Sequence, residues 1–380
     1  MLTRRNCLHL FAAAGLYTAM PALTLAKAPG DKRLVVILLR GGMDGLDVVR
    51  PVGDGAYAKL RGHDDKTIDL DGFFGLNPGL APVVPLFKSR ELSFVHAVAT
   101  PYRARSHFDG QDILEKGGGE NTPGEAGWLN RLLGVMGAAE PALAVDIGSG
   151  SDVILQGPNR HSSWYPDLEM DLPAESSQFL QALYKGDPIL EASFANLQQM
   201  AGQKIESKDV DHGVSPRELA QLAAHFLNKD ARMAAFSITG WDTHVSQQDR
   251  MEGQLGRLSN ALLALKEGLG ANWQNTAVVM CSEFGRTAHL NGTKGTDHGT
   301  GGVAILAGGL LANGRGGEVI ANRWPGLGEG QLHEDRDLLP TDDVRRYPAW
   351  LISALFGIRP AAIAGKVFPG LDMGGDLKLV

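Results

Sequence analysis

Six short apolar segments recur along the chain, and stretches with helical periodicity separate them. The segments are rich in Val, Ile and Leu and are apolar throughout, which is typical of parallel strands covered on both faces. They span residues 33–39, 92–98, 143–147, 233–238, 276–281 and 303–306. Helices are predicted at 78–87, 108–116, 128–136, 178–184, 216–228, 247–268 and 343–356. Strands that alternate with helices predict an α/β fold, a three-layer sandwich with a mostly parallel central sheet.

The first 28 residues have the layout of an export signal. Arg4 and Arg5 precede an apolar run at 8–25, which ends in the small-x-small sequence Ala-Lys-Ala of a cleavage site. The paired arginines predict a twin-arginine signal peptide over residues 1–28, with the twin-arginine translocase as a partner during export. A membrane anchor is the alternative, but the run is short for a span. We therefore expect a periplasmic or secreted protein with no stable membrane span after cleavage.

Residues 29–380 are predicted to form one domain, with surface insertions near 149–171 and 203–214, where the chain is polar or rich in Gly and Pro. The net charge is −7, and removal of the three cations of the leader makes it −10. An acidic chain without Lys/Arg runs argues against nucleic acid as a partner. Cys7 leaves with the leader, so Cys281 has no disulfide partner and is predicted to be a buried, inert thiol.

Acidic and histidine side chains gather in four glycine-containing loops beside the predicted strands. In an open α/β sheet, ligands bind beyond the carboxyl ends of the strands, so these loops are expected to lie together. The side chains are Asp44, Asp242 with His244, Glu283 with Arg286, and Asp297 with His298. Carboxylates and neutral imidazoles bind Zn²⁺ or Mn²⁺ in mixed shells, which predicts a divalent metal site. Each residue also has a structural interpretation: Asp44 as a turn residue, Asp297 as a loop cap, and His244 as the polar start of the long helix.

A possible nucleophile follows the second predicted strand. Ser106 stands at the start of a predicted helix, where free backbone N–H groups favour an anion, and Arg105 adds positive charge beside it. A hydroxyl near a metal ion could attack phosphorus or sulfur. The alternative is that Ser106 only caps the helix, with Asp109 three residues later. His107 is a second candidate ligand or nucleophile in the same loop.

Taken together, these motifs resemble a large bacterial family designated domain of unknown function 1501, whose members usually carry twin-arginine leaders. The motifs that carry the resemblance are LRGGMDG at 39–45, RSHFD at 105–109, GWDTH at 240–244, SEFGRT at 282–287 and TDHG at 296–299. The family is in turn similar to the alkaline phosphatase and sulfatase superfamily, which implies an alkaline-phosphatase-like, two-metal α/β hydrolase. Asp44, Ser106, Asp242 with His244, Glu283 and His298 match the order of that superfamily's ligands and nucleophile.

Two departures from the superfamily pattern bear on the expected activity. Phe284 stands where the superfamily has a metal-binding His, so the second metal site is expected to be altered, with Asp297 or His107 compensating, or absent. The Cys/Ser-x-Pro-x-Arg signature of formylglycine sulfatases is missing, which excludes that route to sulfatase chemistry.

The resulting hypothesis is an exported metal-dependent hydrolase that acts on a phosphate or sulfate ester, either a small molecule or a component of the cell envelope. The divalent ion, Zn²⁺ or Mn²⁺, would be held by the acids and histidines of the four loops; Ser106 would attack, and Arg286 or Arg105 would stabilise the oxyanion. The alternative is a non-catalytic envelope scaffold or binding protein that a metal ion stabilises. Nucleotide binding by Gly41, Gly42 and Gly45 is disfavoured, because their spacing is not G-x-G-x-x-G.

Overall fold

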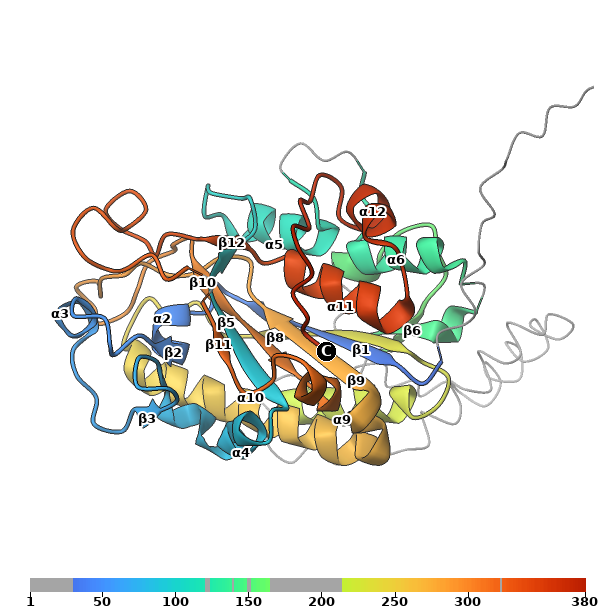
Figure 1. The fold of residues 1–380 in the computed structure, drawn as a ribbon, viewed down its shortest axis with the longest axis horizontal. Helices are drawn as coiled ribbons and strands as arrows, with labels where there is room; N and C mark the ends of the chain where they lie inside the picture. Colours follow the sequence, from blue (N-terminus) through green and yellow to red (C-terminus); the bar gives the residue numbers. More distant parts are fainter. Residues whose placement is uncertain (1–29, 120–123, 139, 149–151, 165–213, 322) are drawn as a thin grey trace, which may run out of the picture.

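The computed structural model describes residues 30–380, apart from 120–123, 139, 149–151, 165–213 and 322 (Figure 1). The predicted signal peptide, the predicted helix at 178–184 and most of the predicted insertion at 203–214 therefore lie outside the described residues. Within them, one nine-stranded sheet runs through the molecule in the order β11-β5-β10-β9-β1-β8-β6-β7, with β12 also paired to β5. Its strands are β1 (Arg33–Arg40), β5 (Leu92–Ala99), β6 (Ala144–Ile147), β7 (Ser162–Trp164), β8 (Met233–Thr239), β9 (Thr276–Cys281), β10 (Gly302–Ala307), β11 (Val319–Ile320) and β12 (Asp342–Asp343).

All six predicted strands are present, and the sheet is mostly parallel, as predicted. β1 lies between β8 and β9 and is parallel to both, with Val36 opposite Ala235 on one side and Val279 on the other. β10 is the exception, because it runs antiparallel to both β9 and β5. Its amino end therefore lies at the same edge of the sheet as the carboxyl ends of β1, β5, β8 and β9.

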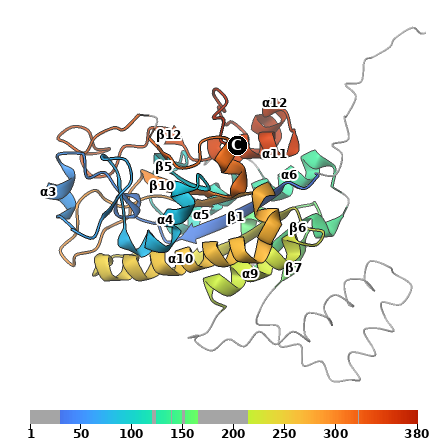
Figure 2. The ribbon, with the colours of Figure 1, turned by 60° about the horizontal axis from the view of Figure 1, so that its bottom comes forward.

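The two faces of the sheet are covered by different helices, which makes the fold a three-layer α/β sandwich. Because side chains alternate along a strand, Val35, Ile37 and Leu39 of β1 enter one core and Leu34, Val36 and Leu38 enter the other. The first core is closed by α9 (Pro216–Leu227) and α10 (Gln247–Leu269), and the second by α6 (Trp128–Met136) and α11 (Arg346–Phe356). Figure 2 shows α9 and α10 on one side of the sheet and α6 and α11 on the other.

The predicted helices within the described residues are present, with small shifts at their ends. The segment at 78–87 forms η1 (Pro78–Val83) and then α4 (Val84–Lys88), and α5 spans His107–Lys116. The helix predicted from residue 343 begins later, because Asp342 and Asp343 pair with β5 as strand β12. The remaining helical elements are α2 (Gly45–Val48), α3 (Tyr57–Arg61), η2 (Pro141–Leu143), η3 (Val153–Leu155), η4 (Gly270–Asn275), η5 (Gly309–Asn313), α12 (Pro360–Ala362) and η6 (Ile363–Val367).

Two regions differ from the prediction. Residues 152–164 were expected in a surface insertion, but they supply the buried side chains Ile154 and Leu155 and the edge strand β7. A second, three-stranded sheet that was not predicted joins β2 (Val49–Arg50), β4 (Gly75–Leu76) and β3 (Ile68–Asp69). Strands of two or three residues are too short to produce a periodic pattern in the sequence.

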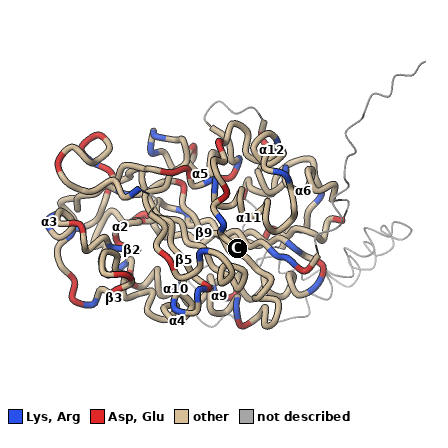
Figure 3. The backbone as a smooth tube through the Cα atoms, viewed as in Figure 1, with Lys and Arg blue, Asp and Glu red and all other residues tan. Residues whose placement is uncertain are grey.

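Lys and Arg residues are interspersed with Asp and Glu residues along the described part of the chain (Figure 3). Cys281 is a buried free cysteine, as predicted, and burial raises the pKa of its thiol to about 12, so it stays protonated and unreactive. Among the described residues, no helix combines the length and the apolar character that a membrane span requires.

Candidate metal centre

Three loops at one edge of the sheet bring a carboxylate and three imidazoles together. His107 begins α5 in the loop after β5, and Asp242 and His244 lie in the loop after β8. His298 precedes β10 and reaches the same edge because β10 is antiparallel to its neighbours. The loop after β1 also packs here, since a Cβ at Gly41 would lie only 2.6 Å from the backbone nitrogen of Asp242. The fold thus places residues that are far apart in sequence around one point.

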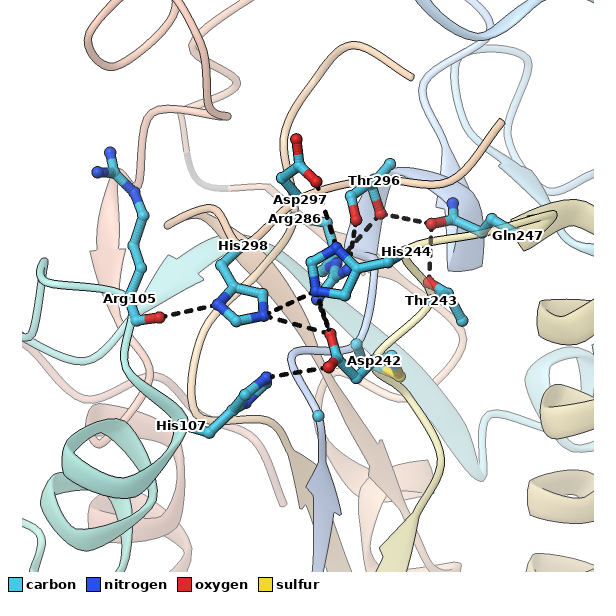
Figure 4. Close-up of polar contacts among 12 residues, drawn as sticks. Arg105, His107, Asp242, Thr243, His244, Gln247, Arg286, Thr296, Asp297 and His298 are labelled. Atoms are coloured by element: carbon cyan, nitrogen blue, oxygen red, sulfur yellow. Dashed lines mark hydrogen bonds and ion pairs between the residues drawn. The ribbon is translucent and has the colours of Figure 1, made fainter. Parts of the chain in front are cut away.

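The four side chains point at one another through their donor atoms (Figure 4). Asp242 Oδ1 lies 2.9 Å from His244 Nε2 and 3.2 Å from His298 Nε2, and these two nitrogens are 3.1 Å apart. On the other carboxylate oxygen, Oδ2 lies 3.5 Å from His107 Nε2. We call these four residues the His₃Asp cluster. Its side chains remain 24–43% exposed, so solvent reaches it.

The outer nitrogen of each imidazole is held by a hydrogen-bond acceptor. His107 Nδ1 lies 2.7 Å from a Glu283 carboxylate oxygen, and His244 Nδ1 lies 3.2 Å from Asp297 Oδ1. His298 Nδ1 lies 2.9 Å from the backbone carbonyl oxygen of Arg105. Carboxylates and carbonyls only accept hydrogen bonds, so each Nδ1 carries a proton, and in the neutral form of each ring Nε2 presents a lone pair inward. This is the arrangement by which proteins orient metal-binding histidines.

The donor atoms of the His₃Asp cluster fit a divalent cation. With Nδ1 protonated, His244 Nε2 and His298 Nε2 are two acceptors 3.1 Å apart, which repel each other unless a proton or a cation lies between them. His107 Nε2 is buried and has no hydrogen-bond partner among the described residues. Ligand atoms about 2.0–2.1 Å from a tetrahedral Zn²⁺ lie about 3.3 Å from one another. The distances from Asp242 to the three Nε2 atoms and the distance between His244 Nε2 and His298 Nε2, 2.9–3.5 Å, bracket that value.

Charges around the cluster shift the pKa values of its members. Burial acts to raise the pKa of Asp242, but the hydrogen bond and the charge of Arg286 outweigh it and lower that pKa. The hydrogen bond that His107 donates to Glu283 raises the pKa of His107, whereas burial lowers the pKa of His298. For Asp297, the hydrogen bond from Asn291 and the one from His244 lower the pKa. Both carboxylates are therefore ionised at neutral pH.

Three predicted ligands, Asp44, Glu283 and Asp297, lie outside the His₃Asp cluster. Asp44 is fully buried, caps α2 through the backbone N–H of Leu46, and forms an ion pair with Arg61 at 2.6 Å. Gln247 Nε2 donates a further hydrogen bond to it. Both oxygens of Asp44 are thus occupied, so this residue has a structural role. A structural role, as a turn residue, was the alternative to metal binding by Asp44 in the sequence analysis.

Glu283 and Asp297 were predicted as metal ligands, but they lie behind the histidines of the cluster. Each accepts a hydrogen bond from the Nδ1 of a histidine in the cluster, and Glu283 also accepts from Gln111 and from the backbone N–H of Gly41. Phe284 packs against the cluster, with its ring centroid 4.9 Å from that of His107. Among the described residues, three members of the His₃Asp cluster, namely His107, Asp242 and His298, form the one set of His, Cys, Asp and Glu side chains whose donor atoms all lie within 4.8 Å of one another.

The family described as "Protein of unknown function (DUF1501)" matches residues 90–345. The chain belongs to the DUF1501 family. The matched range contains all four residues of the His₃Asp cluster and leaves Asp44 outside. No curated protein was found to match the sequence.

Several solved structures are similar to this DUF1501 protein at low identity. The C-terminal periplasmic domain of EptC from Escherichia coli is 9% identical, with a TM-score of 0.41, and the match covers 91% of this chain and 88% of that one. A protein of the alkaline phosphatase superfamily from Vibrio parahaemolyticus is 11% identical, with a TM-score of 0.41 and coverage of 86% and 67%. The PsFucS1 sulfatase from Pseudoalteromonas sp. is 12% identical, with a TM-score of 0.40 and coverage of 92% and 73%.

The predicted catalytic arginines of this DUF1501 protein are both occupied by other contacts. The side chain of Arg105 forms ion pairs with Asp337 and Glu334, and only its backbone carbonyl meets the cluster. Arg286 is completely buried, and its guanidinium donates to Asp242 at 2.6 Å and to Thr296. Arg286 therefore meets the site through Asp242, while Nε and Nη2 of Arg105 are engaged by acidic residues outside the cluster.

Ser106 occupies the N-cap position of α5, but its side chain makes no capping hydrogen bond. The purely structural interpretation of Ser106 as a side-chain cap is therefore wrong. The hydroxyl is partly exposed, in the residue next to His107. Sequence reasoning did not single out Gln247 and Thr296, two buried polar residues behind the cluster, because neither is a metal ligand, although Thr296 begins the TDHG motif.

Proposed function

We propose that this DUF1501 protein is an exported metallohydrolase that uses one divalent ion, Zn²⁺ or Mn²⁺, to cleave a phosphate or sulfate ester. The observation that carries the proposal is the convergence of three Nε2 lone pairs and one carboxylate at a solvent-accessible point of the loop edge. Zn²⁺ and Mn²⁺ both accept this mixture of imidazole and carboxylate ligands. The ester class follows from the order of the motifs along the chain and is the finer part of the proposal.

Each part of the cluster has a definite task in this proposal. The three histidines and Asp242 would hold the ion, while Glu283, Asp297 and the Arg105 carbonyl keep the rings in one tautomer. A bound divalent ion supplies a Lewis acid for an ester oxygen and lowers the pKa of a hydroxyl or a water. The exposed rim of the cluster leaves a further position for substrate or water.

We assign Ser106 the role of nucleophile. Its hydroxyl is not engaged in capping, and it adjoins His107 at the N-terminus of α5. Unpaired backbone N–H groups at a helix N-terminus favour a tetrahedral anion, which is the form of a phosphate or sulfate group under attack.

One ion rather than two is expected at this site. The additional carboxylates that a second ion would need, Asp44 and Glu283, are engaged by Arg61 and by His107. Phe284, which packs on His107, offers no ligand atom. The proposed stoichiometry is therefore one divalent ion per chain.

Metal content is the first test. The mature chain, purified from its own compartment without chelators or a nickel column, is expected to carry about one equivalent of Zn or Mn by mass spectrometry. His244→Ala should lose most of it, whereas His225→Ala, on the surface of α9, should keep it. A folded chain with no metal under these conditions would remove the basis of the proposal.

An ester screen is the second test. Aryl phosphates and aryl sulfates would be assayed with the metal-loaded wild type and with Ser106→Ala. We expect the variant to lose turnover and keep its metal. Because the hydroxyl makes no capping bond, the loss of stability should stay within about 0.5 kcal/mol. Full turnover in Ser106→Ala would remove that residue from the mechanism.

A second function, a metal-stabilised envelope scaffold without catalysis, is favoured by one observation. Four protein ligands, if all bound to one ion, would complete a tetrahedral shell, as in structural zinc sites, where no position stays open. In that case chelation would lower the melting temperature strongly, and no ester would be turned over. The partial exposure of all four side chains favours the hydrolase.

Export remains part of the proposal, through residues 1–28. Replacement of both Arg4 and Arg5 by Lys should leave the precursor in the cytoplasm, because the twin-arginine pathway requires the arginine pair. Cell fractionation, with an antibody against the mature chain for detection, would measure how the protein is distributed between cytoplasm and periplasm. Unaffected export of the double variant would exclude the twin-arginine route. We expect ester substrates in the envelope space and no nucleic acid partner.

A further inference from the structure

Behind the His₃Asp cluster, a chain of buried hydrogen bonds leads from Asp242 into the protein (Figure 4). Arg286 donates through Nη1 to Asp242, through Nε to the Thr296 hydroxyl at 3.1 Å, and through Nη2 to the Thr296 carbonyl. The Thr296 hydroxyl in turn donates to Gln247 Oε1. We call the three residues behind Asp242, namely Arg286, Thr296 and Gln247, the Thr296 network.

Every bond in the Thr296 network has a fixed direction. Arg286 can only donate, so the one hydroxyl proton of Thr296 is free to go to Gln247. Gln247 Oε1 also accepts from Thr243 at 2.8 Å, and its amide nitrogen donates to Asp44, which can only accept. The two ends, a guanidinium and a carboxylate, thus determine which way the amide of Gln247 points. A single arrangement of these side chains satisfies all of the bonds.

The Thr296 network is also closed to water. Arg286, Thr296 and Gln247 are each no more than 2% exposed. A buried polar group that loses its partner cannot replace it with solvent, so a break at one position leaves donors unsatisfied at its neighbours. The position of the Arg286 guanidinium, and with it the plane of the Asp242 carboxylate, therefore depends on Thr296 and Gln247.

We propose that Thr296 and Gln247 are positioning residues of the metal centre, which set its affinity by holding Arg286 against the Asp242 carboxylate. This inference rests on the proposed metal site but not on the ester chemistry. Outer partners of metal ligands typically change metal affinity about 10–100-fold when they are removed. Neither residue touches the proposed ion, so their effect passes through Arg286.

The test is Thr296→Val, which keeps the shape of the side chain and removes the hydroxyl. Zn²⁺ affinity would be measured by competition with a chromophoric chelator, and the melting temperature of the metal-free chain would be measured alongside. Thr296→Ser restores the hydroxyl and is expected to rescue the affinity. Thr300→Val is the matched control, because Thr300 is equally buried in the same loop and its hydroxyl donates only to the Leu338 carbonyl.

We expect Thr296→Val to bind Zn²⁺ about 10–100-fold more weakly, with Thr296→Ser and Thr300→Val near wild type. If Thr296→Val lowers only the melting temperature, or if Thr300→Val weakens Zn²⁺ binding as much, the residues have a merely structural role and the inference is overturned. If Thr296→Val does not fold, Gln247→Met serves as the second variant, because it removes the acceptor of the Thr296 hydroxyl. Unchanged Zn²⁺ affinity in Gln247→Met would also overturn the inference. Failure of the wild type to bind Zn²⁺ or Mn²⁺ would instead overturn the metal centre itself.

Discussion

Asp146 should make the protein less stable as the pH rises. It lies in β6 with 4% of its surface exposed, and its Oδ1 has no hydrogen-bond partner among the described residues. Burial, together with the nearby charges of Asp152 and Glu115, raises the pKa of Asp146 to about 7, and burial raises that of Glu115 similarly. Arg40 pairs with Glu115 and Asp152 and leaves Asp146 without a cation of its own.

The magnitude follows from the two pKa values of this carboxyl. Because the folded pKa is raised, the folded chain holds the proton more tightly than the unfolded chain, so stability falls as the pH rises from about 4 to about 7 and then levels off. The shift from 3.8 to about 7 corresponds to about 4 kcal/mol at pH 8, against about 1.7 kcal/mol at pH 5. Asp146→Asn removes this penalty at every pH.

Urea unfolding of the mature chain at pH 5 and pH 8, with a chelator present to silence the metal centre, would measure the effect. Any packing cost of the amide that Asp146→Asn introduces is the same at both pH values. The difference between the effects of Asp146→Asn at pH 5 and at pH 8 therefore reports only the titration of the Asp146 carboxyl. Relative to wild type, the free energy of unfolding of Asp146→Asn should increase by about 2.5 kcal/mol more at pH 8 than at pH 5. Asp230→Asn, at an exposed position, should show no such difference. Equal effects at both pH values for Asp146→Asn would refute the reasoning.

Three further predictions concern single contacts. Arg61→Met should destabilise the protein by about 3–5 kcal/mol in urea, because it leaves the buried carboxylate of Asp44 unpaired, and Asp44→Asn in the same chain should recover part of the loss. Asp297→Asn should weaken Zn²⁺ binding about 10–100-fold in chelator competition with little change in the melting temperature, since Asp297 is 52% exposed; unchanged affinity would show that His244 needs no such partner. Ser215→Ala should cost about 1 kcal/mol by removing the capping box of α9, and Ser215→Thr should not.

The sheet could be predicted because its strands are buried on both faces. A strand such as β1, with one core on each side, must be apolar at every position, and this pattern is visible without knowledge of its partners. The direction of β10 could not be predicted, because six apolar residues read the same in a parallel and in an antiparallel strand. β11 and β12 pair over two residues each, which is too few to leave a pattern.

For the site, the sequence predicted which loops meet at one edge of the sheet and misplaced some side chains within them. Residue type and loop position suffice for Asp242, His244 and His298, since these loops meet wherever the strands are adjacent. They do not suffice for Asp44, because its role depends on Arg61, a cation on α3 that the sequence analysis did not connect with it. Carboxylates that bind an ion and carboxylates that pair with a guanidinium have the same appearance in a sequence.

The position of β1 in the middle of the sheet has a consequence for how this chain is made. β1 is the first strand to leave the ribosome, but its neighbours β8 and β9 begin about 200 and 240 residues later. At about 5–20 residues per second, synthesis leaves β1 without partners for roughly 10–50 s. During that time both edges of an eight-residue apolar strand are open to other chains. Export in the folded state, as proposed above, would therefore require that this strand is shielded until synthesis is complete.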